Sequence, residues 1–378
     1  MAALQVLAIM ARVNSYFQQG NLPEAALVAN NDWTGGVYLT GNMAHFRASH
    51  NASLLEYAQR WGDAHDWKPA GYRGCHGTLG CPDNIICGQG FADVYELTDP
   101  KNDTLIAATA AALDIASRSP CEVATNSSQA HDSDKCWWWV DALFMALPVY
   151  ARMGSLAATP ADAERIWAAG RAQYNVTAFG VNSTGAPAFG LWSPEESLFY
   201  RDDSYLDKKA ANGKGVFWSR GNGWAFGAMA LTLDALPSEV SNTNDTKNKT
   251  SVLKSRLARD ECFGLIAHRV CMFVMARCAC SQGHSASVAS DRAEYTSKLV
   301  AMAAKVKLLQ GQDGCWRSSL LDAEQFPMIE TSGSSLFVFG LAWGINRGVL
   351  PAADYRAAAM KGWECLNQPS PVRLVCIY

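Results

Sequence analysis

The stretch CWWWVDALFMALPVY, from Cys136 to Tyr150, leads from an aromatic and polar cluster directly into a segment that is apolar on every face. A helix of that kind must be surrounded by protein, because none of its faces suits water. The same unit returns at four other places, so we expect a buried helix to begin at each of them. They are DWTGGVYLTGNMAHF (Asp32–Phe46), PDNIICGQGFADVYEL (Pro82–Leu97), FWSRGNGWAFGAMAL (Phe217–Leu231) and ETSGSSLFVFGLAWG (Glu330–Gly344).

Amphipathic segments lie between these units, and their apolar residues recur at intervals of three and four, as in helices with one wet face. Examples are Ala52–Asp63, Leu105–Ser117 and Ala161–Tyr174. Alternation of fully buried and half-wet helices predicts two concentric rings. The polar clusters would then gather at one end of a barrel, where helix N-termini favour anions. The sequence therefore predicts an all-α fold that forms a single domain over residues 1–378.

Two parts of the chain depart from this repeat. The interval from Arg220 to Glu330 is longer than the others, and the excess falls on an atypical insertion at about 252–292 that lacks a clean apolar period. Three interpretations of it are a surface insertion, a functional lid and translated non-coding sequence. A sixth buried helix at the same spacing would begin beyond Tyr378, so we expect a truncated C-terminus and an incomplete last hairpin.

Composition narrows the class of protein. Hydrophobic residues make up 49% of the chain and charged residues 18%, which allows a large core and excludes disorder. A formal net charge of −3 argues against a nucleic-acid partner, and no uncharged apolar run is long enough to span a membrane. The histidines show no metal-ligand spacing, and no glycine-rich phosphate loop follows a strand. We expect no metal, no cofactor and no nucleic-acid or membrane partner.

Cysteines and glycosylation sequons indicate in which cellular compartment the protein is expected. The pairs Cys75/Cys81 and Cys121/Cys136 flank short polar loops, which suits disulfides better than zinc. Both features favour an extracellular glycoprotein, with a cytoplasmic protein as the alternative, because Met1–Arg12 lacks a clear signal peptide. The Asn-x-Ser/Thr sequons, seven in all, begin at Asn51, Asn102, Asn126, Asn175, Asn182, Asn244 and Asn248.

Two aspartates are candidates for acid–base chemistry. Asp141 lies between the Trp137–Trp139 run and Leu143–Met145, and apolar neighbours raise the pKa of a carboxyl group, as a general acid near neutral pH requires. An aspartate in this place can equally cap the helix that follows. Asp83 allows the same two interpretations, since it also precedes a buried helix and could meet Asp141 across a barrel mouth.

The motif WSRGNGW supplies candidate sugar-binding groups. Trp218 and Trp224 offer ring faces to a sugar, and Arg220 offers a planar fork to a carboxylate. A core tryptophan pair with a structural ion pair is the alternative.

These motifs, together with LFYRDDSYL, DGCWRSSLLD and ETSGSSLFVFGLAWGINRG, resemble the unsaturated rhamnogalacturonyl hydrolases of glycoside hydrolase family 105, which are related to the unsaturated glucuronyl hydrolases of family 88. The resemblance runs from about Asp32 to Trp363. It implies an (α/α)6 barrel of helical hairpins, the six-hairpin glycosidase type. It also implies that Asp141 and Asp83 are catalytic. The substrate-binding positions fall on Trp218, Arg220, Trp224, Met145 and Arg201, the last standing where distant branches have a histidine.

The resemblance further implies a reaction. Such an enzyme removes a non-reducing 4,5-unsaturated uronic acid, here expected to be unsaturated galacturonyl, from rhamnogalacturonan oligosaccharides during pectin degradation. It does so by hydrating the enol-ether double bond, without metal or nucleotide. A second hypothesis is an incomplete, catalytically silent relative that only binds oligosaccharide. A third is an α-solenoid that holds protein partners.

Overall fold

The computed structural model describes residues 2–20, 31–71, 80–118, 137–180, 190–237 and 286–368. Helices dominate this part of the chain, and its strands are the antiparallel pair β1 (Trp192–Ser193) and β2 (Leu198–Phe199). None of the described helices combines the length and the apolar character needed to cross a bilayer. The α-helices are α1 (Ala2–Gly20), α3 (Trp33–Ser49), α4 (Ala52–Ala64), α5 (Pro82–Ile85), α6 (Cys87–Leu97), α7 (Thr104–Arg118), α9 (Ala142–Leu156), α10 (Pro160–Phe179), α11 (Ser219–Ala235), α13 (Ala286–Leu308), α14 (Thr331–Asn346) and α15 (Ala352–Leu366).

An inner row of helices runs through the described residues in the order α3, α5/α6, α9, α11 and α14, with each packing on the next. Within the five units quoted above, each helix begins within one residue of a polar residue that we expected to stand at its start, namely Asp32, Asp83, Asp141, Arg220 and Glu330. Nearly every residue of α6, α9 and α11 is buried. The prediction of an all-α fold is therefore confirmed, down to the starts of the inner helices.

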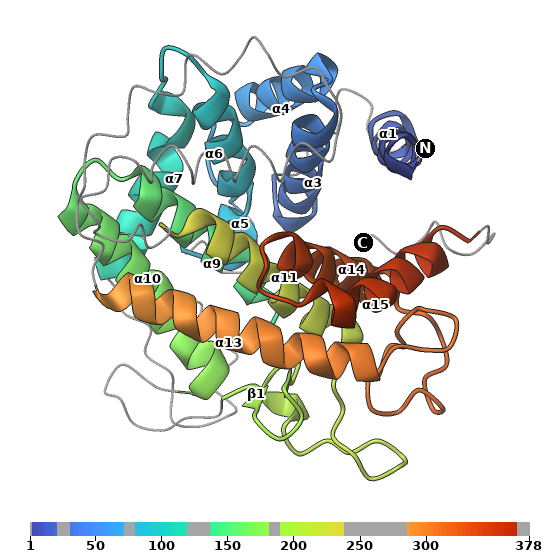
Figure 1. Ribbon diagram of the computed structural model, residues 1–378. Helices are drawn as coiled ribbons and strands as arrows, with labels where there is room; N and C mark the ends of the chain where they lie inside the picture. Colours follow the sequence, from blue (N-terminus) through green and yellow to red (C-terminus); the bar gives the residue numbers. More distant parts are fainter. Residues whose placement is uncertain are drawn as a thin grey trace, which may run out of the picture.

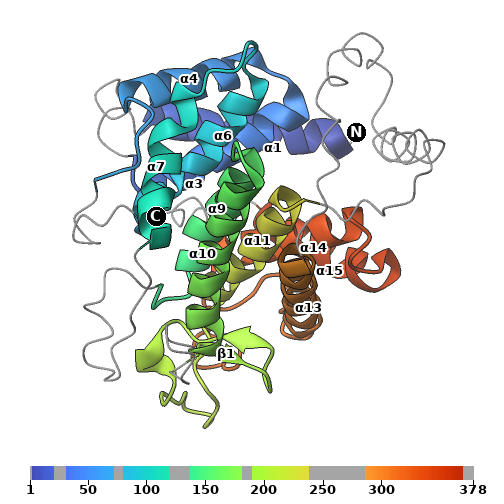
Figure 2. The ribbon, with the colours of Figure 1, turned by 90° about the vertical axis from the view of Figure 1, so that its left-hand side faces the viewer.

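Each inner helix forms a hairpin with the amphipathic helix that follows it. The pairs are α3 with α4, α6 with α7, α9 with α10, α11 with α13, and α14 with α15. Figure 1 shows α9, α11 and α14 at the centre, with α10, α13 and α15 outside them, and Figure 2 shows the same rows from the side. This arrangement is the two-layered hairpin architecture that the alternating sequence pattern predicts.

Helices α11 and α14 approach each other closely at their first turns. A Cβ atom on Gly223 would lie 2.9 Å from Gly333 Cα, and a Cβ atom on Gly333 would lie 2.7 Å from the backbone C and O atoms of Ser219. Only glycine allows such an approach of two backbones. The small residues of these motifs thus bring the starts of two inner helices together.

The two ends of the inner row differ from its middle. The sequence predicted that Glu330–Gly344 would be buried on all sides, but Phe339 of α14 is 38% exposed and lies on a stripe with the exposed Ser335 and Asn346. Helix α3 likewise keeps Gly41, Ala44 and Ala48 in solvent. Among the described helices, only those with an inner neighbour on both sides are buried all round.

The predicted insertion at about 252–292 falls mostly outside the described residues. Its last part does not, because α13 begins at Ala286, so residues 286–292 are regular helix rather than irregular chain. Val288 and Asp291 of this turn are buried, with Arg171 of α10 bonded to Asp291 at 2.7 Å. Regular helix therefore begins earlier than the sequence pattern indicated, because polar residues hide the helical period of residues 286–292.

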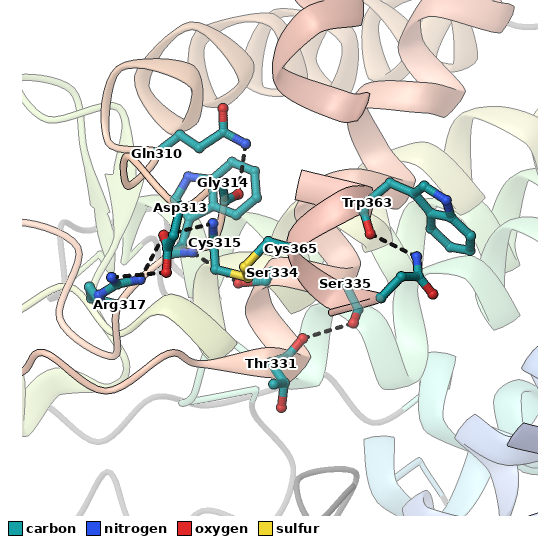
Figure 3. The surroundings of a disulfide bond; sticks show 12 residues. Gln310, Asp313, Gly314, Cys315, Arg317, Thr331, Ser334, Ser335, Trp363 and Cys365 are labelled. Carbon is teal, nitrogen blue, oxygen red and sulfur yellow. Dashed lines mark hydrogen bonds and ion pairs between the residues drawn. A yellow bond between two sulfur atoms is a disulfide. The ribbon is translucent and has the colours of Figure 1, made fainter. Parts of the chain in front are cut away.

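Disulfide bonding is present, but one bond joins residues that the sequence did not pair. Cys315, in the loop after α13, is bonded to Cys365 of α15, 50 residues further along the chain (Figure 3). Cys81 is also disulfide-bonded. Cys75, Cys121 and Cys136 lie outside the described residues, so the predicted Cys75/Cys81 and Cys121/Cys136 pairings stay predictions.

Replacing Gly333 with alanine tests the close contact of α11 and α14. We expect Gly333→Ala to lower the free energy of unfolding by about 1–3 kcal/mol, since its Cβ meets fixed backbone that cannot move aside. Gly41→Ala is the matched control, because a Cβ there meets nothing within 4 Å and alanine favours helix. Urea unfolding followed by circular dichroism measures both. Equal stability of the two variants would refute the contact.

Candidate active site

Three chain segments are tied together where the inner helices begin. The backbone N–H of Val140 donates to the carbonyl of Arg201 at 2.9 Å, and Trp139 forms an antiparallel bridge with Asp202. The side chain of Asn222 accepts from the N–H of Phe199 at 2.8 Å and donates to its carbonyl at 2.9 Å. These bonds hold Asp141, Arg201 and the start of α11 at one end of the barrel.

Asp141 stands directly before α9, and its side chain makes no capping hydrogen bond. The capping interpretation of this residue is therefore wrong. Its Oδ1 atom is shielded from solvent and has no hydrogen-bond partner. Burial raises the pKa of Asp141 to about 7; Arg220 and Arg201 act in the opposite direction, and Asp83 adds to the rise. Asp141 can therefore carry a proton near neutral pH.

Asp83 lies in the first turn of α5, where Cys81 occupies the cap position and Asp83 is not the capping residue. Burial, followed by the negative charge of Asp32, raises the pKa of Asp83 to about 6. The negative charge of Asp83 adds to the raised pKa of Asp141, so the two predicted catalytic carboxylates lie within electrostatic range of each other.

Two guanidinium groups share the ring of Trp218. The guanidinium carbon of Arg220 lies 3.8 Å from the ring centroid and that of Arg201 lies 5.5 Å from it. Arg201 is paired with Asp202 at 2.5 Å, whereas no described carboxylate lies within ion-pair distance of Arg220. The structural ion pair considered for Arg220 is thus absent from the described residues, and its fork is available to an anion beside Asp141.

Trp224 and Met145 lie deeper than the other predicted binding residues. Each follows its neighbour at the mouth by one helical turn, Trp224 after Arg220 and Met145 after Asp141. Trp224 is 7% exposed and packs on Phe144, with ring centroids 4.6 Å apart, and Met145 is 2% exposed. Both belong to the core beneath the carboxylates, so contact with substrate stays a prediction for them.

Two residues of the site escaped the sequence analysis. Asp32, the N-cap of α3, accepts from Thr34 N at 3.0 Å and adds negative charge beside Asp83. Asn222 is fully buried and fixes the strand that leads to Arg201. The only signal for Asn222 was its place between two glycines in WSRGNGW, where a polar side chain is costly to bury unless it is bonded.

The described residues contain no cluster of three or more His, Cys, Asp and Glu side chains placed to hold a metal ion. The candidate site combines two carboxylates, two guanidinium groups and aromatic rings near the starts of the inner helices. Such a set suits the class of glycoside-processing proteins that work by acid–base chemistry.

Comparison with known proteins agrees with this class. The sequence profile of Glycosyl Hydrolase Family 88 matches residues 9–260 and 287–371, and the chain belongs to this family. Between its two matched ranges the profile leaves out residues 261–286, which lie wholly within the segment predicted to be atypical. The resemblance seen in the motifs is thereby confirmed at the level of the family and its relatives.

Two curated relatives carry the name "Unsaturated 3S-rhamnoglycuronyl hydrolase". The protein from Formosa agariphila is 31% identical over 236 residues, which are 61% of this chain and 46% of that protein. The one from Alteromonas sp. is 29% identical over 247 residues, 65% of this chain and 45% of that protein. The matched region thus spans a little under half the length of these relatives.

A solved structure titled "Glycosyl hydrolase family 88 from Bacteroides vulgatus" has the same fold. It is 27% identical in sequence with a TM-score of 0.68, covering 96% of this chain and 85% of that one. The predicted six-hairpin glycosidase architecture is confirmed by this likeness.

Titration of the two aspartates tests the geometry without any substrate. We expect Asp141 to titrate near pH 7, and Asp83→Asn to lower the pKa of Asp141, because the variant removes a negative charge that raises it. Carbon-13 shifts of labelled aspartate carboxyl groups, recorded against pH, measure this. The exposed Asp66 gives the control variant Asp66→Asn. An ordinary aspartate pKa at Asp141 in the unaltered protein would contradict the burial described above.

Proposed function

We propose that this protein is a glycoside hydrolase that removes a non-reducing 4,5-unsaturated uronic acid from an oligosaccharide. One observation carries the proposal: the buried carboxyl group of Asp141, whose Oδ1 atom has no hydrogen-bond partner and which feels the charges of Asp83 and Arg220. This arrangement offers a proton at neutral pH and a cation for the substrate carboxylate at the same place. Family membership supports it.

The reaction follows from the chemistry of an enol ether. Protonated Asp141 donates its proton to C4, and positive charge develops at C5 and the ring oxygen. Water adds at C5 and gives a proton back to ionised Asp141, with Asp83 holding the water. The resulting hemiketal opens as the bond between C5 and the ring oxygen breaks. The hemiacetal left at C1 then releases the remaining sugar as an alcohol, so no net proton is consumed.

The guanidinium groups and ring faces position the substrate. The guanidinium group of Arg220 has the planar donor geometry that a uronate carboxylate needs. It lies on the flat apolar face of the Trp218 ring. A sugar ring packs on such a face through its C–H groups. Trp224 and Met145 form the apolar floor that keeps the pKa of Asp141 high.

The sugar that carries the uronic acid is proposed to be rhamnose. The names of the two curated relatives support this. We retain unsaturated galacturonate, from rhamnogalacturonan oligosaccharides, as the proposed uronic acid, on the motifs that suggested it. If the protein is instead a catalytically silent relative that only binds oligosaccharide, we expect no turnover with either uronic acid.

Replacing Asp141 with asparagine tests the reaction. We expect Asp141→Asn to lower kcat by at least about 10²-fold, since general acid catalysis contributes about 10²–10⁴-fold. Loss of the ultraviolet absorbance of the conjugated double bond measures turnover of unsaturated galacturonyl-rhamnose and unsaturated glucuronyl-rhamnose disaccharides.

Asp66→Asn, at an exposed site, is the control and should retain the unaltered rate. The rate of the unaltered protein should fall as the pH rises through about 7, where Asp141 loses its proton. Full activity of Asp141→Asn would overturn the proposal. Binding of both disaccharides without turnover would establish the silent relative instead.

We further propose that the protein is extracellular. The Cys315–Cys365 disulfide supports this compartment. Two sequons also support it, because Asn51 and Asn102 are exposed at the starts of helices. The sequon at Asn175 is different, since its Thr177 is 1% exposed and donates to the carbonyl of Trp137 at 2.6 Å.

Expression in a eukaryotic secretory host tests the sequons. We expect glycans on Asn51 and Asn102 and none on Asn175, because the oligosaccharide is attached where a sequon is accessible. Peptide mass spectrometry with and without deglycosylation locates them, and Asn51→Gln and Asn102→Gln should each remove one glycan. A glycan on Asn175, with none on Asn51 or Asn102, would contradict the predicted accessibility of these three sequons.

A further inference from the structure

A surface hollow of about 440 Å³ lies in the outer layer of the barrel, where α10, β1 and α13 meet. Its volume falls within the range of small-molecule sites, about 300–1,000 Å³. We call it the outer-wall hollow, and it shares no described lining residue with the candidate active site. The residues that line it are Ala178, Phe179, Gly190, Trp192, Pro194 and Lys298.

Two contacts hold the walls of the outer-wall hollow together. The backbone N–H of Leu191 donates to the carbonyl of Thr177 at 2.9 Å, so β1 lies beside the C-terminal end of α10 (Figures 1 and 2). The hydroxyl group of Tyr174 in α10 donates to Glu294 of α13 at 2.9 Å. The three walls are thus fixed relative to one another before a ligand arrives, and little ordering is needed on binding.

Two aromatic rings and one ammonium group meet in the hollow. Nζ of Lys298 lies 4.8 Å from the centroid of the Trp192 ring and 5.0 Å from that of the Phe179 ring. Phe179 is 41% exposed, and Trp192 is half-buried. The Trp192 ring packs on Phe199 with ring centroids 4.9 Å apart, which fixes its orientation. The hollow therefore presents apolar ring surface to solvent beside a positive charge.

Lys298 is the one charged side chain among the described lining residues. It pairs with Glu294 at 3.0 Å, and its side chain is 13% exposed. The pairing holds the lysine in place over the two rings. An ammonium group has three N–H donors, so donors remain for an oxygen atom of a ligand.

We propose that the outer-wall hollow binds one sugar unit of a polysaccharide chain, as a second site separate from the candidate active site. A sugar presents apolar C–H groups and polar oxygens on the same ring, and the hollow matches both. The rings of Trp192 and Phe179 pack on the C–H groups, and Lys298 donates to a hydroxyl or carboxylate oxygen. A wholly apolar ligand leaves the ammonium group unused, and an inorganic anion leaves the rings unused.

This second site goes beyond the proposed function. It holds the protein on the polymer, whereas the candidate active site acts on an unsaturated end. Binding at the hollow needs no double bond and no proton from Asp141, so the two activities can be measured separately.

Affinity electrophoresis in gels that contain rhamnogalacturonan tests the site. The polymer is one that no lyase has cut, so it lacks unsaturated ends. We expect it to retard the unaltered protein, and we expect Phe179→Ala to raise the Kd about three- to tenfold, the effect of one aromatic contact. Phe339→Ala is the matched control, because Phe339 is 38% exposed on α14 and lies outside the hollow. Absence of retardation, or equal Kd values for Phe179→Ala and the control, would overturn the inference.

A second variant removes the ammonium group and keeps the ring surface. We expect Lys298→Gln to raise the Kd for the polymer as well. Its control is Lys307→Gln, also on α13, whose ammonium group lies 5.3 Å from the ring of Tyr355 and outside the hollow. Circular dichroism establishes that each variant is folded. A Kd unchanged by Lys298→Gln would contradict the role of the lysine.

Turnover of the unsaturated disaccharides separates failure of this inference from failure of the proposed function. Phe179→Ala should keep the kcat and KM of the unaltered protein, because it lies outside the candidate active site. Retardation that persists with an excess of the disaccharide in the gel supports a second site. Release of the polymer by the disaccharide would place it in the active site and overturn the inference. Polymer binding without turnover would remove the proposed function alone.

Discussion

A buried carboxyl group, one of whose oxygen atoms has no hydrogen-bond partner, is the constraint on which the site depends. Removing the Asp141 Oδ1 atom from water without a partner costs free energy, so the surrounding structure must hold the group in place. The backbone bonds from Val140 to Arg201 and the paired bonds between Asn222 and Phe199 do this. They fix Asp141, Arg201 and the start of α11 relative to one another.

Another buried carboxylate of the barrel, that of Asp93, is held differently. Asp93 of α6 is 2% exposed, and both Arg47 of α3 and Arg152 of α9 donate to it. That arrangement links three inner helices and leaves no charge uncompensated, as is usual for a buried ion. The carboxylate of Asp93, which serves the packing of the helices, is therefore fully paired. At Asp141, in contrast, the Oδ1 atom has no hydrogen-bond partner, although the charges of Arg220 and Arg201 act on the group.

The sequence predicted the starts of the inner helices because each combines a polar cluster with an apolar run. That pattern is local and survives any change in tertiary detail. It did not reveal the exposed stripe of α14, since exposure of Phe339 depends on which helices flank it. It also could not pair Cys315 with Cys365, which only the packing of α15 on α14 brings together. The prediction that residues 286–292 belong to the atypical insertion was wrong, because polar surface residues there mask the helical period.

The chemical groups of the candidate site could be predicted from the sequence. The residues that hold those groups in place, or act on their charge, were harder to predict. Asp141, Asp83 and Arg220 stand in motifs whose composition already points to acid–base and anion-binding roles. Asn222 and Asp32 look like ordinary turn and cap residues, and their importance comes from neighbours distant in sequence.

The arrangement of charges also couples substrate binding to protonation under the proposed function. Arg220 and Arg201 lower the pKa of Asp141, against the rise caused by burial. A substrate carboxylate at Arg220 would cancel part of that positive charge and exclude water, and both effects raise the pKa of Asp141. The proton is thus held more firmly when the double bond is in place. Release of the product restores the guanidinium charge and returns Asp141 to a state close to its titration point.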